Sequence, residues 1–157
     1  MGADGEAVRV RRAAPEDLPQ VVGLVIEHAA YEQAAPPPAD LAARLEALLF
    51  GTATPRLRCF VAVLPGEEIV GYASCAPEVS TWDGEEYLHL DCLFLRDGRR
   101  GLGAGRSLMD AVVGHARELG LRQVQWQTPA WNARAIRFYD RLGAPAREKR
   151  RFTLTVD

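Results

Sequence analysis

The sequence lacks the features that mark membrane and secreted proteins. No stretch approaches the roughly 20 consecutive apolar residues that a membrane-spanning helix needs. Residues 1–12 also lack the apolar centre of a signal peptide. We therefore expect a cytoplasmic protein that has no membrane partner.

Cysteine is scarce. The three cysteines, Cys59, Cys75 and Cys92, all lie in apolar runs that are typical of strands. An odd number without metal-ligand spacing argues against a disulfide framework or a zinc site. We expect three small buried side chains in a reducing environment, and no bound metal.

Positive charge is not in excess either. The chain has 19 Lys and Arg against 21 Asp and Glu, a formal net charge of −2. No overall positive field attracts nucleic acid, so we expect no nucleic-acid partner. The one basic run, at residues 147–151, is better explained as the charged edge of a sheet.

The chain does contain enough apolar sequence for one ordinary domain. It has 157 residues, of which 48% are hydrophobic, and we expect a single domain over residues 1–157. Residue patterns predict helices that begin near residues 15, 40, 103 and 132. They predict strands at 7–12, 59–64, 68–76, 87–95, 123–127 and 152–156. The order β-α-α-β-β-β-α-β-α-β indicates an α/β domain with a mixed sheet.

A glycine-rich turn at residues 99–106, Arg-Arg-Gly-Leu-Gly-Ala-Gly-Arg, is the most informative segment. It lies between a strand and a helix, where glycine permits a tight turn and free helix N-terminal amides attract anions. The turn lacks the Gly-Lys-Ser/Thr of an ATP-binding loop and the spacing of a dinucleotide-binding loop. An ordinary glycine-rich turn is the alternative to a pyrophosphate-binding site.

Two motifs make the sequence similar to the GNAT superfamily of N-acetyltransferases. Its Arg/Gln-x-x-Gly-x-Gly/Ala signature is matched by Arg100, Gly103 and Gly105. Residues 131–144 resemble the family's asparagine-to-tyrosine helix, which ends in Leu-Gly-Ala. The resemblance implies a mostly antiparallel central sheet flanked by helices, acetyl-CoA as co-substrate, and a homodimer.

Further segments resemble the diamine, spermidine/spermine and thialysine branch of that superfamily. They are Tyr31-Glu32, residues 80–82, residues 90–95 and Gln125-Trp126-Gln127. The resemblance implies a small primary amine as acceptor. However, Asp91 stands where that branch has glutamate, and Cys92 where it has aspartate. Other acceptors (an amino acid, an aminoglycoside-like amine, a protein N-terminus or lysine) and a catalytically silent CoA-binding sensor therefore stay open.

The resemblance also assigns binding roles. The residues implied for the coenzyme are Leu93, Phe94, Leu95, Arg100, Gly101, Leu102, Gly103, Ala104, Gly105, Arg106, Asn132, Ala135 and Tyr139. Those implied for the amine are Tyr31, Glu32, Asp91, Gln125, Trp126 and Gln127, although Trp126 is equally explained as a buried anchor. Acids in segments that the family folds around the amine are Glu27, Glu32, Asp83, Glu85, Glu86 and Asp91, and scattered surface acids are the ordinary alternative.

Direct attack on a thioester needs a neutral amine, whose pKa is roughly 10.4 when it is a primary alkyl amine. Asp91 is our candidate to accept the proton, directly or through water. On a two-residue repeat, Tyr87, His89 and Asp91 share one face of their strand and Leu88, Leu90 and Cys92 the other, so His89 can join the relay. The alternatives are that Asp91 only anchors the amine and that His89 only bonds a neighbour. Tyr139 matches the family's proton donor to the leaving thiolate, with core packing as its alternative.

Overall fold

The computed structural model describes residues 7–100 and 103–157. It divides the chain into two compact units, one that runs to Trp126 and one that spans Gln127–Asp157. Each is described by itself below. The prediction of one domain stays a prediction.

The first unit holds a mixed sheet with helices on both faces. In chain order its elements are β1 (Arg9–Arg12), the 3-10 turn η1 (Pro15–Asp17), α1 (Leu18–Tyr31), α2 (Leu41–Phe50), β2 (Arg58–Val63), β3 (Ile69–Ser80), β4 (Glu85–Leu95), α3 (Ala104–Glu118) and β5 (Val124–Gln125). Among the described residues the strands lie in the order β1-β2-β3-β4-β5. Neighbours pair antiparallel except β4 and β5, which pair in parallel. The α/β fold class is confirmed.

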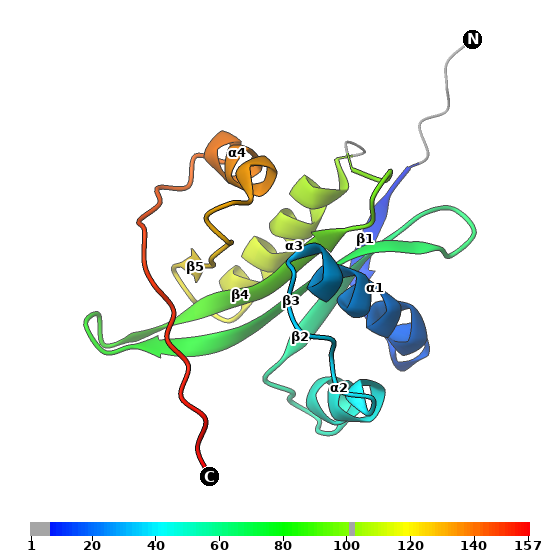
Figure 1. The fold of residues 1–157 in the computed structure, drawn as a ribbon, viewed down its shortest axis with the longest axis horizontal. Coiled ribbons are helices and arrows are strands. Elements are labelled where there is room, and N and C mark those ends of the chain that lie inside the picture. Colours follow the sequence, from blue (N-terminus) through cyan, green and yellow to red (C-terminus); the bar gives the residue numbers. More distant parts are fainter. Residues whose placement is uncertain (1–6, 101–102) are drawn as a thin grey trace. The chain divides into compact units, whose positions relative to one another are not determined.

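Helices α1 and α2 cover one face of the sheet, and α3 covers the other (Figure 1). The core under α1 is built by Leu24, which is fully buried, with Val61, Val63 and Tyr72 from the central strands. On α3, Leu108, Val112 and Ala116 are buried at four-residue intervals, which gives that helix one apolar stripe. The central strands are therefore buried on both faces, by α1 on one side and by α3 on the other.

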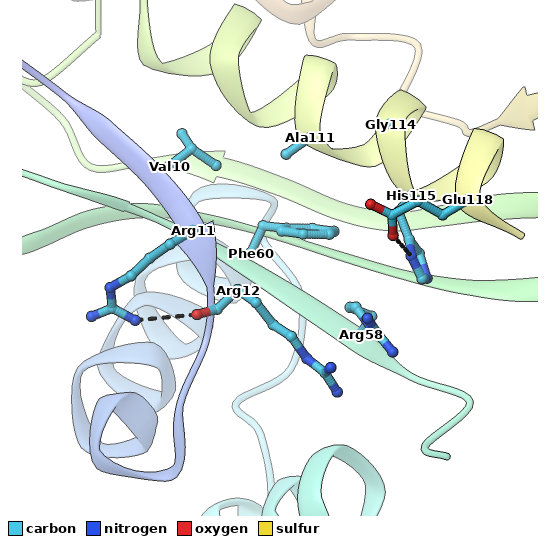
Figure 2. Close-up of a pocket in the computed structure, with 9 residues that line it drawn as sticks. All are labelled: Val10, Arg11, Arg12, Arg58, Phe60, Ala111, Gly114, His115 and Glu118. Carbon is cyan, nitrogen blue, oxygen red and sulfur yellow. Dashed lines mark hydrogen bonds and ion pairs between the residues drawn. The ribbon is translucent and has the colours of Figure 1, made fainter. Parts of the chain in front are cut away.

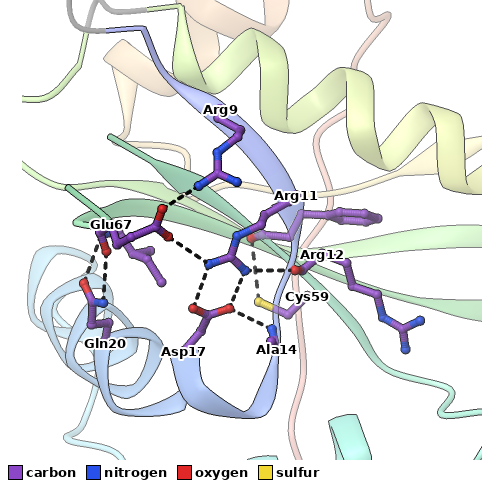
Figure 3. Close-up of polar contacts among 10 residues, drawn as sticks. Arg9, Arg11, Arg12, Ala14, Asp17, Gln20, Cys59 and Glu67 are labelled. Carbon is purple, nitrogen blue, oxygen red and sulfur yellow. Dashed lines mark hydrogen bonds and ion pairs between the residues drawn. The ribbon is translucent and has the colours of Figure 1, made fainter. Parts of the chain in front are cut away.

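Side-chain hydrogen bonds of Asp17 and Gln20 hold the start of α1 against the neighbouring strands (Figure 3). The Asp17 carboxylate accepts two hydrogen bonds from the Arg11 guanidinium, at 2.6 and 2.9 Å, and a third from the Ala14 amide at 2.7 Å. On the next turn, the Gln20 side chain accepts a bond from the Ile69 amide at 2.9 Å. These bonds tie α1 to β1 and to the start of β3.

Most predicted elements are present within a few residues of their predicted bounds. The hairpin turn between β2 and β3 has φ of +90° at Gly66 and +67° at Glu67, and Gly66 supplies the left-handed conformation that such a turn needs. The predicted strand at 123–127 is shorter, Val124–Gln125.

The prediction of a strand at 152–156 is wrong. This part of the second unit has no strand partner in the structure, and Phe152, Leu154 and Val156 are each about nine-tenths exposed. Alternation of apolar residues predicts which side chains share a face, but a strand also needs an edge to pair with. The second unit does form α4 (Ala133–Arg141), as predicted.

Candidate functional site

A bulge in β4 shapes the centre of the candidate site. Ser74 of β3 pairs with Cys92, and Cys75 pairs with Leu90, so Asp91 has no opposite residue in this ladder. The Asp91 side chain is 61% exposed, and its Oδ1 lies 3.7 Å from His89 Nε2. The structure therefore brings together the two residues that we predicted for proton transfer.

The same bulge overturns one prediction about faces. Cys92 does not share a face with Leu88 and Leu90. It packs against the core cluster under α1, to which Phe94 belongs. One extra residue in a strand shifts the two-residue alternation of every later side chain, and sequence periodicity does not reveal where that residue lies.

One edge of β4 is open beyond the bulge. Strand β5 pairs with β4 only at Leu88 and His89, whereas β3 pairs with β4 as far as Leu95. Within the described residues, no strand covers the β5-side edge of Leu93, Phe94 and Leu95. Backbone amides and carbonyls on such an edge can pair with an amide-bearing chain such as the pantetheine arm of a coenzyme.

The glycine-rich turn leads directly into the N-terminus of α3. Gly103 precedes that helix with φ of +74°, a left-handed conformation that glycine adopts without strain. Ala104 and Gly105 are buried, and Arg106 is exposed and lies 3.3 Å from Asp110. The predicted residues Gly101 and Leu102 lie outside the described residues. A helix N-terminus with two nearby guanidiniums suits a pyrophosphate group.

Arg100 connects this turn to α1. Its guanidinium carbon lies 4.9 Å from the ring centroid of Tyr31, a cation–π contact. Nη1 of Arg100 lies 3.8 Å from Oδ1 of Asp97. The structure thus places the predicted amine-site residue Tyr31 next to the predicted coenzyme-site residue Arg100.

The end of α1 holds a residue that our sequence analysis missed, His28. Its ring stacks on Phe94 with a centroid distance of 4.9 Å. Nδ1 lies 2.8 Å from the Tyr72 hydroxyl, and Nε2 lies 2.5 Å from Oε2 of Glu32. Burial lowers the pKa of His28, and the nearby Glu32 and Asp91 carboxylates only partly oppose that effect. The signal was present, because His28 follows buried Leu24 by four residues and precedes Glu32 by four.

Only some of the predicted acids gather near Asp91. Glu27 is paired with the Arg96 guanidinium at 2.8 Å. Asp83 lies in the turn between β3 and β4, and its carboxylate accepts a bond from the Ser80 hydroxyl. Glu85 and Glu86 begin β4, and Glu85 precedes Asp91 by six residues, about 20 Å along an extended strand. Glu32, the residue after α1, pairs with His28, on which the Asp91 carboxylate also acts electrostatically.

The first unit ends with Gln125 and Trp126, two of the residues predicted to contact the amine. Gln125 pairs with His89 across the parallel ladder, and its side chain donates to Gln123 at 3.1 Å. Trp126, which follows it, is half-buried. Gln127 is exposed and belongs to the second unit.

The second unit contains the predicted asparagine and tyrosine. Asn132 is buried, and its side-chain oxygen accepts from the Ala135 amide at 3.3 Å, so it caps α4 as predicted. Its amide nitrogen donates to the Thr128 hydroxyl at 3.4 Å. Tyr139 lies seven residues beyond Asn132, about two helical turns, and its ring packs near Phe138.

The comparison with protein families decides the assignment. The model of the acetyltransferase (GNAT) family matches residues 24–144, which is most of the chain. The chain belongs to the GNAT acetyltransferase family. Its match covers the second half of α1, the open edge of β4, the glycine-rich turn and α4.

Curated relatives of this acetyltransferase include proteins named as thialysine and ornithine acetyltransferases. It is 31% identical over 144 residues to a thialysine N-epsilon-acetyltransferase of Bos taurus, covering 87% of this chain and 84% of that protein. It is 31% identical over 90 residues to an L-ornithine N5-acetyltransferase of Arabidopsis thaliana, covering 57% of this chain and 40% of that one.

A solved structure shows the same fold. It is an aminoglycoside acetyltransferase from an uncultured soil metagenomic sample, in complex with sisomicin. The TM-score is 0.77 at 22% identity, with 96% of this chain and 97% of that chain covered. At this sequence identity the similarity shows a shared fold and does not indicate which acceptor is used.

The acetyltransferase also has a cavity of about 370 Å³ away from the predicted site residues (Figure 2). Arg12, Arg58, Phe60, His115 and Glu118, from β1, β2 and α3, are among its lining residues. The described residues show no cluster of His, Cys, Asp and Glu able to hold a metal. Nor does any described helix have the length and apolar character to cross a membrane.

Proposed function

We propose that this acetyltransferase moves the acetyl group of acetyl-CoA to a primary amine of a small molecule by direct attack. The observation that carries the proposal is the bulge in β4, which presents Asp91 where the pairing with β5 ends. A thioester held along the open edge would have its acetyl group beside a carboxylate. Proximity of this kind is what converts a slow bimolecular reaction into a fast one.

The coenzyme would occupy the open edge and the glycine-rich turn. Main-chain groups of Leu93, Phe94 and Leu95 would pair with the pantetheine arm. Arg100, Arg106 and the α3 amides from Gly103 to Gly105 would hold the pyrophosphate. Asn132 and Ala135 would contact the coenzyme from the start of α4. Buried Ala104 and Gly105 support this fit, since small residues let a ligand approach the backbone closely.

We propose a cationic acceptor of the polyamine, diamine or thialysine kind. Asp91, Glu32, Tyr31, Gln125, Trp126 and Gln127 would surround it. The support is the exposed Asp91 carboxylate and the relatives that act on thialysine and ornithine. In this reaction Asp91 accepts the amine proton, with His89 beside it, and Tyr139 donates a proton to the leaving thiolate.

We also propose that the enzyme is a cytoplasmic homodimer. The exposed alternating Phe152, Leu154 and Val156 support a second copy as partner, since large exposed apolar side chains in one segment are typical of an interface.

The test is free-thiol release from acetyl-CoA with spermidine, spermine, putrescine, lysine, thialysine, ornithine, an aminoglycoside and a short peptide. Asp91→Asn should lower kcat/KM by about 10²–10⁴-fold, the usual share of a general base, while acetyl-CoA affinity stays unchanged. Tyr139→Phe should lower kcat far more than coenzyme affinity. Asp40→Asn, the same substitution at the exposed residue that precedes α2, is the matched control and should leave turnover unchanged.

Two outcomes would refute the proposal. Acetyl-CoA binding without turnover of any amine would favour the CoA-binding sensor. Turnover with the peptide alone would move the acceptor to a protein amine.

A further inference from the structure

The proton that Asp91 accepts needs a further destination, and this argument rests on the proposed amine acetylation. Asp91 is 61% exposed at the site. A carboxylate that has accepted the amine proton must pass it on before the next cycle. The structure contains a continuous set of polar side chains that leads away from it.

The first link is Cys92. Its thiol donates to Oδ2 of Asp91 at an Sγ–Oδ2 distance of 3.6 Å. On the α1 face Cys92 lies diagonally across the β3–β4 ladder from Tyr72, and the thiol and the phenol interact electrostatically. The bulge makes this possible, because the shift in alternation turns Cys92 to the α1 face immediately after Asp91.

The second link is Tyr72, which is 2% exposed. Its hydroxyl lies 2.8 Å from Nδ1 of His28. Burial raises the pKa of Tyr72, so the phenol stays neutral and can only accept one proton while it donates another.

The last link is the pair His28 and Glu32. Glu32 lies 2.5 Å from Nε2 of His28 and its side chain is 30% exposed, which gives the pair access to solvent. Phe94 holds the imidazole by stacking on it. Of the other groups nearby, Tyr31 contacts Phe94 and carries Arg100 over its ring, and Glu27 is neutralised by Arg96.

We infer that His28 is the final proton acceptor of the reaction, reached from Asp91 through the Cys92 thiol and the Tyr72 hydroxyl. The amine N–H bond breaks and an Asp91 O–H bond forms. Asp91 then protonates the sulfur as Cys92 passes its proton to the Tyr72 oxygen, and Tyr72 passes its own to Nδ1 of His28. The imidazolium is stabilised by the Glu32 carboxylate and loses its proton to solvent beside Glu32.

The final arrangement agrees with the hydrogen bonds observed. After transfer, Nδ1–H of His28 donates to Tyr72 and Cys92 donates to Asp91, which are the two contacts present in the structure. The Tyr72 hydroxyl then turns its proton toward the neighbouring sulfur. A neutral His28 is needed at the start, and its lowered pKa provides one near pH 7. His28 acts through Tyr72 and Cys92 and need not touch the amine.

The experiment is the pH dependence of kcat, measured by thiol release with saturating acetyl-CoA and the amine that wild type acetylates. In wild type, kcat should fall as pH drops below about 6.5, because His28 becomes protonated. His28→Gln should abolish this acid limb and lower kcat at pH 7.5 by about 10–100-fold, toward the lower end of proton-transfer effects.

Two pairs of variants separate proton transfer from a structural role. Tyr72→Phe should behave like His28→Gln, whereas Tyr87→Phe, a tyrosine of β4 that bonds Glu78, should keep the wild-type profile. Cys92→Ser can still pass a proton and should keep most activity, whereas Cys92→Ala should not. Thermal melting and acetyl-CoA affinity are followed for each variant, and NMR titration of His28 gives its pKa directly.

The inference is overturned if His28→Gln or Cys92→Ala keeps the wild-type profile and rate, or if the His28 pKa lies above 7. If the wild-type enzyme acetylates amines and these variants are unaffected, the relay is refuted but the proposed function is not. If the wild-type enzyme acetylates no amine, both are refuted.

Discussion

Among single residues, Asp17 is the acid whose loss we expect to destabilise the protein most. It is buried, and its carboxylate accepts bonds from Arg11 and the Ala14 amide. These contacts, led by the Arg11 hydrogen bonds, lower the pKa of Asp17. Asp17→Asn should lower the free energy of unfolding by about 2–3 kcal/mol, since it removes charge-assisted bonds and leaves Arg11 poorly paired. Urea denaturation at pH 7.5 measures this.

Arg9 provides the comparison for that prediction. Its ion pair with Glu67, at 2.8 Å, joins two side chains that are both more than half exposed. Exposed pairs contribute about 0–1 kcal/mol, so Arg9→Gln should be nearly neutral. Equal effects of the two substitutions would show that burial of Asp17 does not determine its contribution.

Individual site residues differ in how far the sequence could predict them. The prediction that His89 lies beside Asp91 is confirmed, because both belong to one strand. The role of Asp91 in proton transfer stays a prediction. The Tyr31–Arg100 contact joins two residues that were predicted for different ligands. His28 was not predicted, because its four-residue spacing from Glu32 shows only that the two share one side of α1, and its partner Tyr72 is 44 residues away in the sequence.

At the level of elements, the N-terminus of α3 depends on the backbone of Gly103. Its φ of +74° is left-handed, and an alanine there costs about 1–2 kcal/mol. Gly103→Ala should therefore lower stability by about that amount. It should also weaken acetyl-CoA binding, because the turn must shift to relieve the strain.

Gly114 in the same helix is the matched control. It has an ordinary helical conformation, and an added Cβ meets no atom within 4 Å. Gly114→Ala should raise the free energy of unfolding by about 0.5–1 kcal/mol and leave coenzyme affinity unchanged. Thermal melting and calorimetric titration with acetyl-CoA test both variants, and a harmless Gly103→Ala would contradict the role given to this turn.

The elements also show where sequence patterns stop being informative. Helices and long strands followed from periodicity, because burial of one face requires it. The bulge at Asp91 did not, since the residues around it read as a regular strand. Apolar and polar residues alternate at 152–156, but this segment has no strand partner in the structure. Pairing depends on neighbours that a local pattern does not contain.

For the whole molecule, titratable groups set a pH range of maximal stability. Burial lowers the pKa of His28 and His115, so the unfolded chain binds more protons and stability falls as pH drops below about 6.5. The pKa of Asp17 is also lowered, so stability decreases further once the pH drops below the ordinary aspartate pKa of 3.8. These signs agree, so stability on the acid side should decrease steadily.

The alkaline limit comes from cysteines that are buried in the sheet. Burial raises the pKa of Cys59 to about 12 and that of Cys75 to about 11, from an ordinary value of 9.0. Raised thiol pKa values mean that the folded protein holds protons which the unfolded chain releases, so stability is complete below pH 9 and decreases above it. Burial also raises the pKa of Cys92 to about 11. Three thiols should cost about 4 kcal/mol per pH unit between pH 9 and 11. Urea denaturation with reductant at pH 7.5, 9.5 and 10.5 measures this slope, and Cys75→Ala should lower it by about one third. A stability that is flat over this range would mean that the thiols are accessible to solvent in the folded protein, contrary to the burial on which the fold of β2 and β3 depends.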